Sequence, residues 1–253
     1  GWRKVTTSEG DFYAAWKYYR LPENCLKALA WTSVLEGAKL FFVWSYSPPT
    51  QATLDAGDID RLAVAQADKS NFVWWTMAGR PGLTNRHLAE FADAAREIRR
   101  YERIITRMVK RPDLAVETKE KFTFARAFQT PTQSGLFFVV HNANVGTWPE
   151  GSRYFFTEKD NISISDQGDL VGYQPAREPI DVHLTFAEGV LAAAGKTDGL
   201  FDLAAGREIK PQEGTYAVPV PPGSGTILFL GRRELADQWH SLVLPPTFPA
   251  APQ

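Results

Sequence analysis

The chain has 253 residues, of which 44% are hydrophobic and 23% are charged, and its formal net charge at pH 7 is −1. This composition is typical of a globular protein with room for one large or two modest domains. A charge so close to zero argues against a nucleic-acid partner, and because no run of about 18 apolar residues occurs, we expect no membrane-spanning helix.

The first 46 residues predict a helix followed by a buried strand. Pro22 suits the first helical turn, and Gly37 suits the C-terminal cap, where φ is positive. The next run, residues 39–46 (KLFFVWSY), is apolar through Val43, which is typical of a strand covered on both faces in a parallel sheet. After a long connection over 50–84, a second long helix is expected to run up to Pro112.

The composition changes near residue 112, where helical periods give way to short apolar runs separated by Gly, Pro, Asn and Asp. This pattern is typical of a β-sandwich. The predicted strands are at 121–129, 136–142, 153–158, 161–165, 179–186, 199–203, 215–220 and 226–230.

Side chains that bind metals or cofactors are few and scattered. The histidines, at positions 87, 141, 183 and 240, have no ligand spacing, and no zinc, calcium, phosphate-loop or dinucleotide pattern occurs, so the sequence predicts no metal and no cofactor. The single cysteine, Cys25, is expected to be a small core residue. The first residues are not a signal peptide; any targeting signal would lie upstream, so the localisation is left open, and a secreted or periplasmic protein fits as well as any other.

Several segments in the first part resemble the closing helix and eighth strand of retaining glycoside hydrolases with (β/α)8 barrels, the beta-galactosidase-like and related families. They are Arg20-Leu-Pro, Ala30-Trp31, Leu35-Glu-Gly-Ala-Lys39 and Phe41-Phe-Val-Trp-Ser-Tyr46. The helix that ends in Arg96-Glu-Ile-Arg-Arg-Tyr101 resembles the last barrel helix of these enzymes.

The second part is similar to the C-terminal β-sandwich of many glycosidases, in which a hairpin is followed by a strand, a Pro-Gly turn and a final apolar strand. The matching segments are 199–209, 216–220 and 222–228, and residues 138–142 resemble a strand that ends in Asn early in such domains. The resemblance implies a fold that is α/β followed by all-β. Residues 1–111 would form the C-terminal end of a TIM-barrel domain, a (β/α)8 barrel. Residues 112–253 would form an antiparallel β-sandwich accessory domain with a loose Pro-rich tail.

A complete barrel of this kind takes roughly 250 residues. Its earlier strands would therefore lie upstream, and the chain is expected to be the C-terminal part of a larger protein. Such a fragment would need the remaining part of the barrel, or another chain, as a partner to cover its open edge. We expect the fragment alone to be inactive.

The resemblance also implies a site that cleaves glycosidic bonds with two carboxyl groups about 5 Å apart. Glu9, after a short β-branched stretch, is the candidate nucleophile at the end of the seventh strand, and the acid/base partner would come from upstream. Trp44 and Tyr46, at the end of the eighth strand, and Trp74 and Trp75, in the long connection, are the candidate residues that bind a saccharide substrate. The alternative is that Glu9 is an exposed turn residue and that the aromatic residues fill the barrel top or anchor the loop.

Two other functions remain open at this stage. The chain could be a non-catalytic β-sandwich carbohydrate-binding or interaction module, with Trp148 and Trp239 as contact residues. It could also be a barrel that has lost its catalysis. The Ser224 motif, Gly-Ser-Gly, lacks the form of a hydrolase nucleophile elbow and is discounted.

Overall fold

The computed structural model describes residues 2–7, 10–15, 22–39, 86–148 and 170–246. The chain divides into two compact units, which are taken separately below. The first comprises Gly1–Pro22, Phe42–Ala89 and Thr147–Gln174, and the second comprises Glu23–Phe41, Glu90–Gly146 and Pro175–Gln253. The domain limit that the sequence suggested, between residues 111 and 112, falls inside the second unit.

The first unit contains an antiparallel hairpin, in which strand β1 (Trp2–Thr7) pairs with strand β2 (Gly10–Ala15). Trp2 lies opposite Ala15, and Thr7 lies opposite Gly10. This hairpin contradicts the predicted seventh barrel strand, because a strand of a (β/α)8 barrel is followed by a helix and pairs with parallel neighbours.

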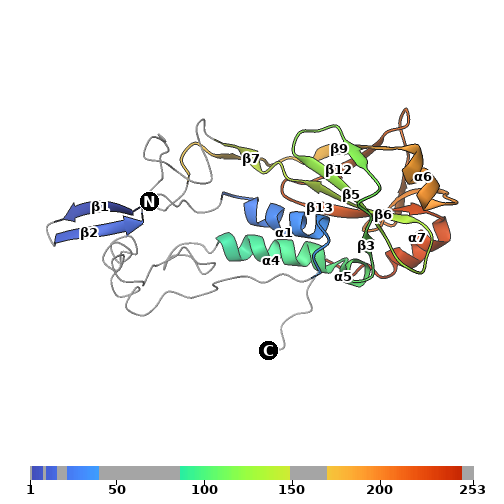
Figure 1. The fold of residues 1–253 in the computed structure, drawn as a ribbon, viewed down its shortest axis with the longest axis horizontal. Helices are drawn as coiled ribbons and strands as arrows, with labels where there is room; N and C mark the ends of the chain where they lie inside the picture. Colours follow the sequence, from blue (N-terminus) through green and yellow to red (C-terminus); the bar gives the residue numbers. More distant parts are fainter. Residues whose placement is uncertain (1, 8–9, 16–21, 40–85, 149–169, 247–253) are drawn as a thin grey trace. The chain divides into compact units, whose positions relative to one another are not determined.

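A six-stranded antiparallel sheet is the centre of the second unit (Figure 1). Its strands, in spatial order, are β11 (Arg207–Ile209), β10 (Gly199–Asp202), β13 (Gly225–Gly231), β6 (Leu136–Asn142), β5 (Thr123–Gln129) and β3 (Val109–Lys110). All seven residues of β6 are buried, because this central strand is covered on both faces. Its Val-rich and Phe-rich sequence matches that position.

One face of this sheet packs against a second antiparallel sheet. The second sheet consists of β12 (Tyr216–Val220), β9 (Ile180–Phe186) and β4 (Val116–Thr118). Val182 and Leu184 point into the core between the sheets, and His183, between them, lies on the outer face. β4 also lies beside β5, so the two sheets meet at a corner there. Helix α6 (Glu188–Ala194) follows β9, and β7 (Gly146–Thr147) pairs with β8 (Gln174–Pro175).

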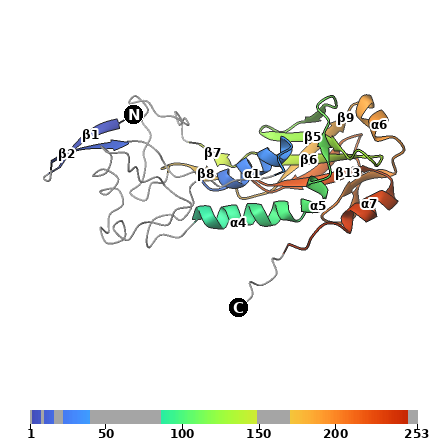
Figure 2. The same cartoon turned by 60° about the horizontal axis from the view of Figure 1, so that its bottom comes forward.

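Helices cover the opposite face of the six-stranded sheet (Figures 1 and 2). They are α1 (Cys25–Leu35), α4 (Arg86–Arg99), α5 (Glu102–Ile105) and α7 (Arg233–His240). α1 and α4 lie side by side and run in the same direction, with Lys27 beside Glu90 and Trp31 beside Glu97.

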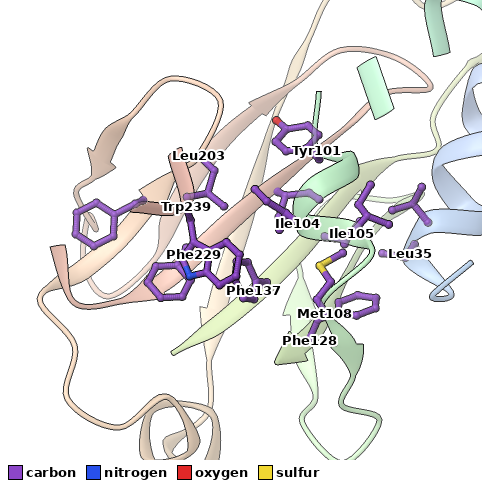
Figure 3. Packing of buried hydrophobic residues seen from close by; sticks show 14 of the residues in the cluster. Leu35, Tyr101, Ile104, Ile105, Met108, Phe128, Phe137, Leu203, Phe229 and Trp239 are labelled. Carbon is purple, nitrogen blue, oxygen red and sulfur yellow. The ribbon is translucent and has the colours of Figure 1, made fainter. Parts of the chain in front are cut away.

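Aromatic side chains fill the core under these helices (Figure 3). The ring centroids of Phe137 and Trp239 are 4.9 Å apart with their planes at 84°, and those of Trp31 and Tyr101 are 6.1 Å apart at 71°. Each of these edge-on contacts adds about 1 kcal/mol to the burial of the rings. Trp239, proposed from the sequence as a surface contact, is only 5% exposed and belongs to this core. Trp148 is half-buried, with its ring 5.3 Å from that of Tyr173.

The predicted fold class, a barrel end followed by a β-sandwich, is therefore wrong. Every described strand pair with a known register is antiparallel, whereas a barrel end requires parallel strands. The helices lie on the six-stranded sheet, most of which is formed by residues after 112, so they do not belong to a separate α/β layer. The apolar run at 40–46 lies outside the described residues. Within the described residues, we find no helix that is long and apolar enough to span a bilayer.

Candidate functional site

The five site residues that the sequence suggested are not among the residues that the structure describes. Glu9, Trp44, Tyr46, Trp74 and Trp75 remain predictions. The described residues offer two other groups of side chains: an exposed aromatic corner between the two sheets and a partly buried polar network beneath α1.

The aromatic corner consists of Lys121, Phe122 and Phe124, at the turn from β4 to β5. Phe122 has a φ of 61°, in the left-handed region that a bulky residue seldom adopts. Its side chain is nevertheless 53% exposed, and that of Phe124 is 40% exposed. Lys121 Nζ lies 4.9 Å from the centre of the Phe122 ring. The left-handed backbone at Phe122 therefore costs about 1–2 kcal/mol, and the aromatic side chain at this position is exposed to solvent.

Hydrogen bonds hold this strained turn in place. Thr123 Oγ1 donates to the carbonyl of Glu120 at 2.7 Å, and Thr118 Oγ1 donates to the carbonyl of Thr123 at 2.8 Å. The carbonyl of Phe122 accepts from the backbone N–H of Ala143, also at 2.8 Å. Several hydrogen bonds of this kind can hold a residue in an unfavourable backbone conformation. Residues held in this way are frequent at binding sites.

Glu120 ties the same turn to the outer face of the three-stranded sheet. Its two carboxylate oxygens accept from the backbone N–H of His183 at 2.9 Å and from Nδ1 of the same residue at 2.6 Å. Partial burial acts to raise the pKa of Glu120, but the hydrogen bonds from His183 outweigh it, and the pKa is lowered from its usual value. The carboxylate is therefore ionised at neutral pH and acts as a fixed acceptor.

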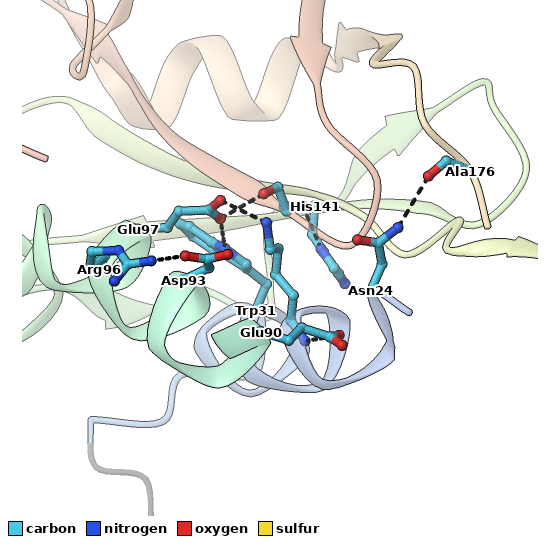
Figure 4. Close-up of polar contacts among 10 residues, drawn as sticks. Asn24, Trp31, Glu90, Asp93, Arg96, Glu97, His141 and Ala176 are labelled. Atoms are coloured by element: carbon cyan, nitrogen blue, oxygen red, sulfur yellow. Dashed lines mark hydrogen bonds and ion pairs between the residues drawn. The ribbon is translucent and has the colours of Figure 1, made fainter. Parts of the chain in front are cut away.

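The partly buried polar network lies where α1 and α4 meet the turn before β13 (Figure 4). Glu97 is its centre: Oε2 accepts from Ser224 Oγ at 2.6 Å and from Trp31 Nε1 at 3.0 Å, and Oε1 pairs with Lys27 Nζ at 3.0 Å. Because the Glu97 side chain is 34% exposed, each of these hydrogen bonds contributes about 1 kcal/mol. The network therefore fastens both helices to the sheet.

His141, on β6, lies beside this network and is fully buried. Its Nδ1 is 2.8 Å from the carbonyl of Ser224, and its Nε2 is 3.2 Å from Thr32 Oγ1. Burial disfavours the charged imidazolium and lowers the pKa of His141; the hydrogen bond to Ser224 opposes this effect without cancelling it. His141 is therefore neutral at pH 7.

The network contains the residue types of a nucleophilic site, but not the required arrangement. A serine nucleophile donates its hydroxyl proton to the base that activates it. Here the Ser224 hydroxyl binds Glu97, and the hydrogen bond between Ser224 and His141 is made by the backbone carbonyl of Ser224, not by its hydroxyl. Ser224 is 2% exposed, so no substrate reaches it. No group of three or more potential metal ligands occurs in the described part of the chain.

Sequence reasoning missed the aromatic corner and the role of the Gly-Ser-Gly turn. The alternation of Phe122, Phe124 and Ala125–Phe128 predicted a strand, but it did not show which face stays exposed. The left-handed backbone at Phe122 has no sequence signal, since Gly or Asn would be expected there. Glu97 looked like an ordinary charge on a helix face.

Comparison of the chain with protein-family models, with characterised proteins and with solved structures found no match. The interpretation of both groups of residues therefore depends on their geometry.

Proposed function

We propose that the second unit is a non-catalytic carbohydrate-binding module whose contact surface is the aromatic corner. The observation that carries this proposal is Phe122, an exposed ring held at a positive φ. Neither the backbone strain at Phe122 nor the exposure of its ring stabilises the folded chain, so contact of the ring with a ligand accounts for both.

The chemistry of the corner suits a saccharide. The apolar face of a pyranose packs on an aromatic ring, and two such rings, Phe122 and Phe124, are exposed within three residues of each other. Lys121 Nζ lies over one face of the Phe122 ring, and its three N–H groups can donate to the hydroxyl groups of a sugar that packs on the other face. The hydrogen bonds of the turn hold the backbone beneath these side chains, which reduces the entropy that binding would cost.

The partly buried polar network supports a non-catalytic role. Its carboxylate, Glu97, is occupied by Lys27, Trp31 and Ser224. His141 is enclosed and makes its contacts with Ser224 and Thr32. These contacts join secondary-structure elements to one another.

Affinity electrophoresis of the full chain in gels that contain soluble xylan, galactan, β-glucan or starch tests this proposal. We expect at least one polysaccharide to retard the chain, and Phe122→Gly and Phe124→Ser to reduce the retardation at least tenfold in apparent affinity. Because glycine adopts a positive φ without strain, Phe122→Gly should leave the free energy of unfolding unchanged or raise it by up to about 1 kcal/mol.

Leu191→Ala is the matched control, because Leu191 is an apolar side chain on α6 that is 45% exposed and does not belong to the corner. It should migrate as the wild type does. Migration of Phe122→Gly that equals that of the wild type in a retarding gel would refute the assignment of the corner, and an absence of retardation in every gel would refute carbohydrate binding.

A second candidate function is that the chain forms part of a carbohydrate-active hydrolase. One observation favours it: the hairpin β10–β11, β12, the Pro221–Ser224 turn and β13 follow one another in the order that the resemblance to glycosidase C-terminal domains implies. Asp202 Oδ1 accepts from the N–H of Ala204 at 2.8 Å within that hairpin, as a tight Asx turn does. In this case the reaction would depend on Glu9 and on upstream residues.

Assays of the longest available form of the protein on a panel of chromogenic glycosides test the second candidate, with Glu9→Gln alongside. Hydrolysis that falls by more than about 100-fold in Glu9→Gln would support the nucleophile. Equal hydrolysis in the two proteins would remove Glu9 from consideration.

A further inference from the structure

The aromatic corner carries positive charge as well as exposed rings. Lys119 and Lys121 are both exposed, and Glu120 lies between them in the chain. The carboxylate of Glu120 is already occupied, because its two oxygens accept hydrogen bonds from His183 at 2.9 Å and 2.6 Å. All ion pairs within the described ranges of the chain involve other cationic residues. Two ammonium groups of the corner are therefore available to a ligand.

A third cation lies on the same strand as Phe124. Arg126 follows Phe124 by two residues on β5, so the two side chains are on the same face of the strand, about 7 Å apart along it. The carboxylate of Glu36 lies 3.7 Å from the Arg126 guanidinium, and it also pairs with Lys110. One carboxylate is thus shared by two cations, which leaves an excess of positive charge on this side of Phe124.

This positive charge acts locally. The whole chain has a formal net charge of −1, so its overall field does not attract a polyanion. At physiological ionic strength, exposed charges attract each other within a Debye length of about 8 Å. Lys121 Nζ is 4.9 Å from the centre of the Phe122 ring, and its flexible stem lets the ammonium group follow a ligand. An anionic group on a sugar that packs on Phe122 therefore lies within range of this cation.

We propose that the aromatic corner selects acidic polysaccharides, in which uronic acid units carry a carboxylate on the pyranose ring. This inference rests on the proposed carbohydrate-binding function and names the substrate class of the same site. The pyranose packs on Phe122 or Phe124, and its carboxylate pairs with the lysines. Hydrogen bonds between charged groups are roughly twice as strong as those between neutral groups. A neutral sugar keeps the packing on the rings, so it binds more weakly.

Single-stranded nucleic acids also combine negative charge with flat rings, but the corner suits them less well. Proteins bind them along a positively charged groove that follows successive phosphates, with aromatic side chains for successive bases. At the corner the cations are few, and the exposed Glu117 on β4 adds a negative charge beside them. A small group of lysines matches the carboxylate of a single sugar unit better than it matches a continuous phosphate backbone.

Affinity electrophoresis of the full chain at low ionic strength tests the inference, in gels that contain polygalacturonate or its fully methyl-esterified form. The ester keeps the sugar rings and removes the charge, and retardation is measured against a gel without polymer. We expect at least fivefold tighter binding of polygalacturonate than of the ester. The double variant Lys119→Gln/Lys121→Gln should lose this preference, because an exposed ion pair contributes up to about fivefold in affinity. Its affinity for the ester should change less than about twofold.

Lys196→Gln is the matched control for the single variant Lys121→Gln, since each removes one exposed positive charge. Lys196 precedes β10, which pairs with the last residues of β13, whereas Phe124 lies level with the first residues of β13. The control charge is therefore at the other end of the six-stranded sheet. Lys196→Gln should keep the preference of the wild type for polygalacturonate.

The outcomes separate this inference from the proposed function. Equal retardation by the two polymers, with Phe122→Gly lowering both, would overturn the selection of acidic sugars and leave carbohydrate binding in place. An unchanged preference in the double variant would overturn the role of the lysines. Tighter binding of single-stranded oligodeoxythymidine than of polygalacturonate would identify a nucleic-acid site instead. Failure of every polysaccharide, acidic or neutral, to retard the chain would refute both the inference and the proposed function.

Discussion

Glu120 shows at the scale of one residue how the aromatic corner depends on charge. Its carboxylate accepts two hydrogen bonds from His183, and its pKa is lowered as a result. A carboxyl group whose pKa is lower in the folded state stabilises the fold above its unfolded value of about 4.3, and that stabilisation is lost as the pH falls through the folded pKa. The aromatic corner should therefore loosen only in acid, as the pH falls below about 4.3.

Glu120→Gln should accordingly lower the free energy of unfolding by about 1 kcal/mol at pH 7, because a neutral amide binds His183 more weakly. The difference from the wild type should shrink as the pH falls through the lowered pKa of Glu120 in the folded state, because the wild-type carboxyl group then becomes neutral as well. Urea unfolding at several pH values measures it. Glu117→Gln, on the exposed side of β4, is the control and should show no such trend; a difference that is constant across the pH range would contradict the role of the carboxylate.

Single residues were partly predictable from the sequence. Gly37, expected at a helix C-terminus with positive φ, has a φ of 93°, and Cys25 is buried. Leu29, although it follows Leu26 and precedes Val34 at helical spacing, is 48% exposed, and Trp31 is fully buried in the core. Helical spacing shows which residues share a face, but the partner surface decides which face is buried.

At the scale of elements, glycines set how closely α1 approaches the sheet. A Cβ atom at Gly225 would be 2.5 Å from Trp31 Cε3 and 2.9 Å from the carbonyl oxygen of Val140. The Trp31 ring has little freedom to move, since its Nε1 donates to Glu97. The neighbouring Gly223 has a φ of +70°, and a Cβ atom there would be 2.6 Å from the backbone oxygen of Asn24. The Gly-Ser-Gly turn is therefore a docking site for α1, which explains why it lacks the form of a catalytic motif.

Gly225→Ala should lower the free energy of unfolding by about 2–3 kcal/mol, because the added methyl group forces Trp31 or the β6 backbone to shift. Gly189→Ala on α6 is the matched control: a Cβ atom there would meet nothing within 4 Å. It should stabilise the protein by up to about 1 kcal/mol, since alanine favours a helix. Chemical denaturation followed by tryptophan fluorescence measures both. A Gly225→Ala protein as stable as the wild type would refute the close packing of Trp31.

The strands of the second part were the most predictable elements. The runs expected at 136–142, 179–186 and 215–220 correspond to β6, β9 and β12. Their β-branched and aromatic residues and their turns are local signals. The division of these strands between two sheets, with β6 between β13 and β5, depends on contacts distant in sequence, which no local pattern shows.

At the scale of the whole molecule, the barrel prediction failed because a helix followed by an apolar run does not specify its partners. The same local order occurs when a helix covers an antiparallel sheet that later residues form, as α1 does here. The compact second unit takes residues from both sides of position 112. The composition changes near residue 112 because α1, α4 and α5 come before it and most of the strands come after it. These helices and the six-stranded sheet share one core.

This shared core leads to a prediction about the chain cut at the composition boundary. A fragment of residues 112–253 would lose α1, α4 and α5, which cover Phe128, Phe137 and Phe229 on the sheet. An exposed apolar face of this kind promotes aggregation. The loss of Trp31, Tyr101 and Ile104 alone, each buried to 98% or more, removes about 6 kcal/mol of burial energy, comparable to the whole stability of a domain.

We therefore expect the fragment 112–253 to be aggregated, or to unfold without a cooperative transition. A chain of residues 22–253, which keeps α1, α4 and α5, should be monomeric and should unfold cooperatively. Size-exclusion chromatography and urea unfolding of the two proteins distinguish these outcomes. Cooperative unfolding of a monomeric 112–253 fragment would show that the sheets fold without the helical layer, and that the contacts of Trp31 and Glu97 merely attach α1 and α4 to a domain already complete.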